Sequence, residues 1–149
     1  MLRVYEFEFY ESEDGRFVVA DPFGVGEGTF GDDLRDAVES AADWLEGWLR
    51  SYLVKGEEPP EPEFGHDPRH GGRVIAVAVD FDLSKVPAVT AADASRMLGV
   101  STARVAQMCE SGALESWRDG SRRMVSLDSV EARLADPPKA GRPRKAATA

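Results

Sequence analysis

The 149-residue sequence has a single cysteine, Cys109, and no apolar run that approaches the roughly 18–20 residues a membrane-spanning helix needs. An internal disulfide is therefore excluded, and a reducing, cytoplasmic environment is the simpler expectation. The first residues include acidic ones where a secretory signal peptide would be basic and then apolar, so export by that route is not expected. Hydrophobic residues make up 42% of the chain and charged residues 30%, which is typical of a folded globular protein.

Basic residues are also scarce, and the net charge of −9 argues against a nucleic-acid partner, because affinity for phosphates comes mostly from Lys and Arg. The deficit is uneven along the chain, however. Residues 1–88 hold 20 acidic residues against 8 Lys and Arg, a net charge of −12, whereas residues 89–149 hold 7 against 10, a net charge of +3. This asymmetry predicts two modules, one suited to a basic partner and the other to an acidic one.

The first 85 residues are predicted to form a β-β-β-α-β layer. Apolar and polar residues alternate over residues 3–11, and an Asp-Gly turn leads to a second apolar run at residues 17–20, a pattern typical of a β-hairpin. Residues 25–30 are rich in glycine and predict a weaker edge strand. A long helix is expected to start at Asp32 and Asp33 and to end at Gly56.

The rest of this module is predicted to contain a connector and one more strand. Residues 57–72 contain four of the nine prolines and are expected to form an extended connector. Residues 74–79 are apolar on both faces, so we expect a strand that is central in the sheet or buried at a dimer seam. Trp44 and Trp48 lie on the apolar stripe of the long helix and are assigned to the core rather than to a ligand site.

Residues 89–136 are predicted to form a second domain after a linker at residues 86–88. Thr90 begins a capping box in which Asp93 replaces the usual Glu, and Ser101 caps a second short helix after a glycine turn. Apolar segments on either side of an Asp-Gly tip then predict a hairpin with a cationic rim. Asp128 is expected to cap a last helix.

Three motifs in this domain point to a known family: TAADASRMLGVS at residues 90–101, Gly112-Ala113-Leu114, and GSRRMV at residues 120–125. Together they resemble the winged helix-turn-helix of excisionase and MerR-type regulators, in which the second helix enters the DNA major groove and the wing contacts the backbone or the minor groove. The resemblance implies DNA contacts from the second helix and the wing: Ser101, Thr102, Arg104, Gln107, Arg118, Arg122 and Arg123. The chemistry agrees, because Arg and Gln can bond to base edges and clustered arginines bind phosphates. Ordinary solvated charges are the alternative.

The first module also carries family motifs: FVVADP at residues 17–22, GTFGDDLRDAVESA at residues 28–41, and VIAVAV at residues 74–79 before Asp80. They resemble the HicB antitoxin family over residues 4–81. This resemblance implies an α+β fold of the partial ribonuclease-H-like type, and with it a possible small, basic HicA-like toxin as partner. Acidic positions on the first strand and at the start of the long helix are the predicted contacts for that partner: Glu6, Glu8, Asp32, Asp33 and Asp36.

Residues 137–149 form a small, polar, basic tail that we expect to be disordered. Its Gly-Arg-Pro core with flanking cations resembles an AT-hook, which binds the narrow minor groove of A·T-rich DNA. Arg142 and Arg144 are the residues that would contact DNA. A tail that only aids solubility is an equally good interpretation.

Enzyme interpretations have less support. Pro68 interrupts the only histidine-bearing cluster, residues 66–70, and no metal-site motif completes it, so no metal or cofactor is expected. Cys109 has no histidine base near it in sequence. Metal-dependent hydrolysis on a ribonuclease-H-like sheet would need converging carboxylates, such as Glu6 and Glu8 with Asp80 and Asp82, but so acidic a module contains such pairs routinely.

The combined hypothesis is a cytoplasmic, nucleoid-associated antitoxin and transcriptional repressor. Its second domain would bind double-stranded operator DNA, and its acidic first domain would hold a basic toxin. A single helix-turn-helix reads only half of an operator, so a homodimer or a higher even assembly is expected. The alternative is a stand-alone excisionase-like or MerR-like regulator whose first domain only oligomerises.

Overall fold

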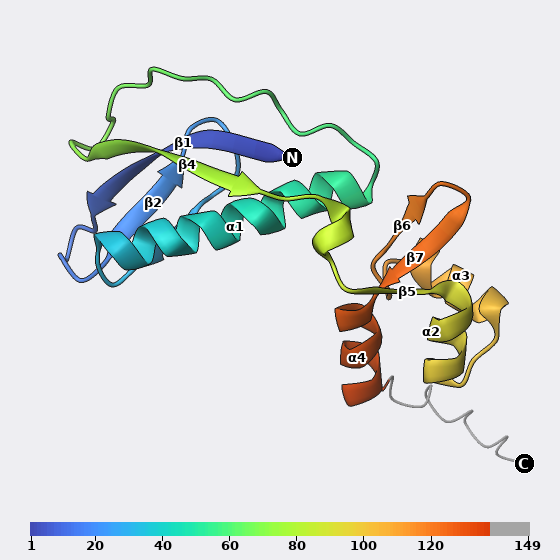
Figure 1. Cartoon of the computed structure of the whole chain (residues 1–149). Coiled ribbons are helices and arrows are strands. Elements are labelled where there is room, and N and C mark those ends of the chain that lie inside the picture. The colour runs from blue at the N-terminus through green and yellow to red at the C-terminus, as the bar shows by residue number, and fades with distance from the viewer. Residues whose placement is uncertain (138–149) are drawn as a thin grey trace, which may run out of the picture. The chain divides into compact units, whose positions relative to one another are not determined.

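The computed structural model describes residues 1–137, and these form two compact units, Met1–Lys85 and a second that begins at Val86 (Figure 1). The mixed α/β character and the helix-turn-helix predicted for the second half are confirmed. No helix in residues 1–137 is long and apolar enough to cross a membrane.

The first unit is a four-stranded antiparallel sheet with one helix on it. The strands are β1 (Leu2–Glu11), β2 (Val18–Pro22), β3 (Thr29–Gly31) and β4 (Arg73–Asp80), in the order β3-β2-β1-β4. Helix α1 (Leu34–Val54) lies across one face (Figure 1). The predicted β-β-β-α-β order is therefore confirmed.

Alternation along β1 places its aromatic side chains against α1. Tyr5, Phe7 and Phe9 are buried, and they pack with Leu45 and Leu49 of α1 in the core. Trp44 contacts the edge of Phe7 with ring centroids 5.9 Å apart, and Trp48 contacts the edge of Tyr5 at 5.3 Å. Both tryptophans therefore serve packing, as predicted. The Asp33 carboxylate accepts a hydrogen bond from the Asp36 N–H at 2.8 Å and caps α1, also as predicted.

The opposite face of β1 is covered rather than open. Residues 57–72, hereafter the strap, run along the side of the sheet that α1 leaves free (Figure 1). Glu8 accepts backbone hydrogen bonds from Arg69, His70 and Gly72 at 2.7–2.9 Å and is only 1% exposed. Glu6 accepts from both the backbone N–H and the ring Nδ1 of His66. The expectation of an exposed Glu6–Glu8 face is therefore wrong, because the strap brings backbone N–H donors onto that face.

Two strand predictions also need correction. β4 is not central: within residues 1–137 it pairs with β1 alone and forms one edge of the sheet. The edge position predicted for the glycine-rich strand is confirmed, although β3 covers only Thr29–Gly31. β2 extends through Pro22, which stands opposite Phe7 at the end of the ladder, and the next residue, Phe23, supplies a donor to the Glu6 carbonyl.

A short 3₁₀ turn, η1 (Leu83–Lys85), ends the first unit. The second unit contains α2 (Ala91–Leu98), α3 (Thr102–Glu110) and α4 (Leu127–Ala135), with a three-stranded antiparallel sheet in the order β5-β7-β6. The strands are β5 (Ala88–Thr90), β6 (Ser116–Asp119) and β7 (Arg122–Ser126). Its core is built from small and medium apolar side chains: Ala94, Val105, Met108, Leu114, Val125 and Val130.

Two local expectations for the second unit are wrong. The predicted linker, residues 86–88, is partly inside the domain, because Ala88 begins β5 (Ala88–Thr90), which pairs with β7. Ser126, not Asp128, caps α4: its hydroxyl accepts a hydrogen bond from the Ser129 N–H at 3.3 Å, so the helix starts two residues earlier than predicted.

Candidate nucleic-acid interface

The turn between α2 and α3 sets the direction of α3 relative to α2. Gly99 has φ +66°, a left-handed conformation that favours glycine, and it ends α2. The Val100 N–H donates to the Ser95 carbonyl at 3.1 Å, while the Ser95 hydroxyl donates to the Val100 carbonyl at 2.6 Å. Ser101 then caps α3 by accepting from the Arg104 N–H at 3.1 Å. The predicted helix-turn-helix geometry is thus closed by side-chain and backbone hydrogen bonds on both sides of the turn.

α3 has one buried and one exposed face. Val105 and Met108 lie in the core, whereas Thr102, Arg104 and Gln107 are exposed. Arg104 and Gln107 are one turn apart, and the Arg104 guanidinium donates to Gln107 Oε1 at 3.4 Å. This arrangement puts a bidentate donor and an amide, the two groups best suited to guanine and adenine edges, side by side on the open face of α3.

The wing is the hairpin of β6 and β7, and its register differs from the expected one. Gly120 and Ser121 form the two-residue tip, with Gly120 at φ +62°, so the tip is not Asp119-Gly120. Arg118 therefore stands directly opposite Arg123, and Asp119 stands opposite Arg122. Directly opposite residues share one face of a hairpin, with Cβ atoms about 5 Å apart.

The Arg118–Arg123 pair is a like-charge pair, which is unfavourable in the hairpin on its own. In the described part of the chain, no carboxylate forms an ion pair with Arg104, Arg118, Arg122 or Arg123. An anion placed between Arg118 and Arg123 would relieve their repulsion and accept hydrogen bonds from both. The register thus places two arginines without a carboxylate partner side by side on the hairpin.

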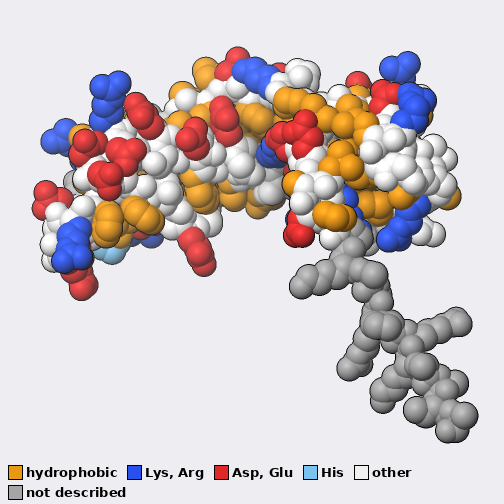
Figure 2. Space-filling view, turned by 90° about the horizontal axis from the view of Figure 1, so that it is seen from below, with side chains coloured by type: hydrophobic (Ala, Val, Ile, Leu, Met, Phe, Trp, Pro, Cys, Tyr) orange, Lys and Arg blue, Asp and Glu red, His pale blue; other side chains and the backbone are white. Residues whose placement is uncertain are grey.

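Arginines of the first unit are used differently. Arg3 pairs with Glu58, Arg16 with Asp14, and Arg35 with Glu39. Figure 2 shows acidic side chains scattered across the visible face of the first unit, and Lys and Arg side chains that project from the second. These three arginines of the first unit are paired with carboxylates, whereas, within residues 1–137, the four predicted contact arginines of the second unit are not.

The remaining predicted contacts separate into three groups. Arg142 and Arg144 lie outside the described residues. Asp32 and Asp33 are exposed at the start of α1, and Asp36 is half-buried, with its carboxylate accepting from the Asp32 N–H at 2.8 Å. Glu6 and Glu8 are occupied by the strap. The acidic surface predicted for a partner is therefore divided, and only the start of α1 is accessible.

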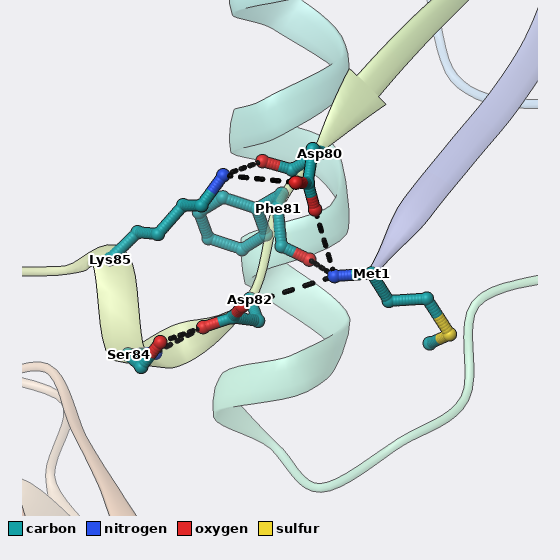
Figure 3. Close-up of polar contacts among 6 residues, drawn as sticks. All are labelled: Met1, Asp80, Phe81, Asp82, Ser84 and Lys85. Atoms are coloured by element: carbon teal, nitrogen blue, oxygen red, sulfur yellow. Dashed lines mark hydrogen bonds and ion pairs between the residues drawn. The ribbon is translucent and has the colours of Figure 1, made fainter.

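The carboxylates considered for hydrolysis are far apart. Glu8 stands opposite Val74 and Asp80 stands opposite Leu2, so they lie near opposite ends of the β1–β4 ladder. Asp80 accepts from the Met1 amino group at 3.0 Å and pairs with Lys85, and the Ser84 N–H donates to Asp82 (Figure 3). The hydrogen bond from Met1 and the positive charge of Lys85 lower the pKa of Asp80. In residues 1–137, no three His, Cys, Asp or Glu side chains are grouped as a metal site.

The structure adds one feature that sequence reasoning missed, an exposed aromatic pair beside the acidic start of α1. Phe17 is 39% exposed and Phe30 is 59% exposed, and their rings meet edge to face at 5.2 Å. With Val19 they line a shallow hollow bordered by Glu27. The signal in the sequence was the alternation at the start of β2: Phe17, just before the strand, and Val19 share one face, while Val18 and Ala20 lie on the other.

A family model described as a helix-turn-helix domain matches residues 88–136, from β5 through α4. No curated protein and no solved structure matches the chain. The second unit is therefore a helix-turn-helix domain, and DNA is the partner that this similarity supports. The resemblance of residues 4–81 to the HicB family has no counterpart in these comparisons and stays a prediction.

Proposed function

We propose that this protein is a sequence-specific transcriptional repressor that binds operator DNA with α3 in the major groove and the wing on the phosphate backbone. The observation that carries the proposal is the wing register, which sets Arg118 opposite Arg123 with no carboxylate partner in residues 1–137. Such a pair gains most from a phosphate. Arg104 and Gln107 would read base edges, and Ser101 and Thr102, at the start of α3, would help to position it.

The size of α3 limits what one chain can read. Nine residues make a helix about 13 Å long, which spans about four base pairs at 3.4 Å each. Four base pairs specify a half-site only, so two chains would act together on half-sites about 10 base pairs apart or a multiple of that distance. Such a regulator would work in the cytoplasm, in association with the nucleoid.

Selection from a pool of randomised duplexes by the full-length protein tests this function. The expected outcome is an enriched, two-fold symmetric sequence whose half-sites are separated by a whole number of helical turns. The variant Arg104→Ala should enrich a less defined sequence, and Arg35→Ala, which makes the same charge change in the first unit, should enrich the parental one. A pool that shows no enrichment with the parent protein contradicts sequence-specific binding.

For the first unit, we propose an antitoxin role: it would bind a small basic toxin and neutralise it. The exposed Phe17–Phe30 pair favours this role, because an aromatic pair next to Glu27, Asp32 and Asp33 offers an apolar contact inside an acidic border. Acidic charge would speed the encounter with a basic surface, and the aromatic contact would supply affinity and specificity. Glu6 and Glu8, covered by the strap, contribute to neither.

Co-purification with the product of a small basic reading frame next to the gene tests the antitoxin role. Phe30→Ser should lower the affinity at least about tenfold, as expected for an interface hot spot, whereas Phe64→Ser, which changes an equally exposed aromatic residue of the strap, should not. If no neighbouring basic protein exists, or if it fails to bind the parent protein, the alternative of a stand-alone excisionase-like or MerR-like regulator takes its place.

A further inference from the structure

Strand β4 has an unprotected edge. Its eight residues, Arg73–Asp80, pair with β1 on one side and with no strand of residues 1–137 on the other. The six residues between the two ends are all Val, Ile or Ala, with no charge and no proline. Natural sheets usually protect a free edge with charges, proline, a bulge or a very short strand. β4 has none of these features along its central six residues.

The other edge of the same sheet is different. β3 is only three residues long, and it turns directly into the acidic start of α1. A three-residue strand followed by Asp32 and Asp33 offers little backbone for another strand to join. Only the β4 edge is therefore long enough to extend the sheet.

On both faces of the sheet, the side chains of β4 leave room for another strand beside it. Val77 and Val79 are buried beneath α1, while Ala76 and Ala78 are exposed on the opposite face. Because these exposed residues are small, a second strand and its side chains could approach without a steric clash. The end charges are also complementary: Arg73 begins the strand and Asp80 ends it, so an antiparallel copy brings each arginine toward the aspartate end of the other strand.

We propose that β4 pairs with β4 of a second copy of this chain, antiparallel, so that the two four-stranded sheets become one. Residues on the same face must stand opposite each other in such a pairing. The midpoint of Arg73–Asp80 lies between Ala76 and Val77, but an axis there would pair residues that point to opposite faces. The two-fold axis must therefore pass through a residue, and the two residues nearest the midpoint are Ala76 and Val77. Both α1 helices then lie on the same side of the joined sheet.

A second copy fits this edge better than another kind of partner. The edge is complementary to itself in length, in apolar character and in its end charges, and an isologous contact requires that property. The acidic charge of the first unit opposes the pairing at low ionic strength, so added salt strengthens the dimer. DNA binding has the opposite salt dependence. The pairing deepens the proposed function, because it supplies the two chains that an operator needs, but it exists without DNA.

Sedimentation equilibrium of the full-length protein tests the pairing with two charge variants. In Ala76→Glu with Ala78→Glu, either position of the axis sets glutamates opposite each other, and in Ala76→Lys with Ala78→Lys it sets lysines opposite each other. Each variant alone should dissociate at least about tenfold more readily than the parent. An equimolar mixture should dimerise again, because in a mixed dimer Glu faces Lys wherever two substituted positions stand opposite each other. Gly47→Glu with Ser51→Glu adds the same charge at exposed sites of α1 and should leave the dimer unchanged.

The outcomes separate this proposal from the proposed function. Any of three outcomes overturns the β4 pairing: the parent protein is monomeric at micromolar concentration, the variants dimerise like the parent, or the mixture stays monomeric. These outcomes are also the ones expected if a strand of another protein occupies the β4 edge. Binding to a single half-site by such a monomer would leave the DNA-binding proposal intact. A β4 dimer that binds no DNA would support the β4 pairing and contradict the DNA-binding proposal. Circular dichroism of each variant confirms that it is folded.

Discussion

Glu8 of the first unit and Arg118 of the second both lie on strands of small antiparallel sheets, but their surroundings are opposite. Glu8 is buried and accepts three backbone hydrogen bonds from the strap. Arg118 is exposed and faces another arginine across the hairpin. The first charge has its partners within its own unit and stabilises the fold. The second lacks a carboxylate partner in residues 1–137, as expected of a group that binds an external anion.

The largest effect is expected from a variant that destabilises one unit, because it tests whether the two units unfold independently of each other. Phe7 is completely buried in the first core, so Phe7→Ala should lower the free energy of unfolding of that unit by about 3–5 kcal/mol. The second unit has its own core and should melt as in the parent. Calorimetry would resolve the two transitions, and Trp117 fluorescence would follow the second unit in a chain that lacks Trp44 and Trp48. Phe30→Ala, at an exposed site, is the control.

A smaller effect is expected from removing the charge that holds the strap. Burial alone would raise the pKa of Glu8, but the hydrogen bonds from Arg69, His70 and Gly72 hold it below the usual value. Glu8→Gln should therefore cost about 2–3 kcal/mol of stability at neutral pH. Glu11→Gln, an exposed change on the same strand, should cost less than about 0.5 kcal/mol.

The same group makes the strap sensitive to acid. Because the folded pKa of Glu8 is lowered, its contribution to stability is complete above the unfolded value of about 4.3 and is lost as the pH falls through the folded value. The protection of the amides of Arg69, His70 and Gly72 against hydrogen exchange, measured relative to the intrinsic rate at each pH, should fall in this acidic range in the parent. In Glu8→Gln these amides should already exchange rapidly at neutral pH, and slow exchange there would contradict the role of the carboxylate.

The smallest effect is expected in the wing, where the sign of the change in the free energy of unfolding is more informative than its size. Arg118→Gln removes the repulsion with Arg123 and should stabilise the second unit by about 0.2–1 kcal/mol, while it weakens DNA binding. Asp119 stands opposite Arg122 without forming an ion pair with it, so Asp119→Asn should lower the stability of the unit by less than about 0.5 kcal/mol. Thermal melting of both variants, together with binding of one duplex, tests whether stability and binding change in opposite directions. A destabilised Arg118→Gln would contradict the like-charge interpretation.

Local signals in the sequence were sufficient for the helix-turn-helix. Thr90, Ser101 and Gly99 each act on a backbone within a few residues, so their roles as caps and as a turn follow from spacing alone. The cover over Glu6 and Glu8 could not be predicted in this way, because the donors lie 60–64 residues away in a connector without periodicity. The wing register depends on which two residues form the tip. A shift of one residue would have moved Arg118 away from Arg123.

The central claim is that α3 reads bases while the wing binds phosphates, and a salt titration of DNA binding tests it most directly. Affinity for the selected operator and for an unrelated duplex would be measured for the parent, for Arg104→Ala and for Arg122→Ala with Arg123→Ala. The double variant should bind both duplexes more weakly, with a salt slope smaller by about 2. Arg104→Ala should weaken the operator complex by about 1–3 kcal/mol and leave the unrelated duplex nearly unchanged. Parental binding by both variants at every salt concentration would contradict the assignment of this surface.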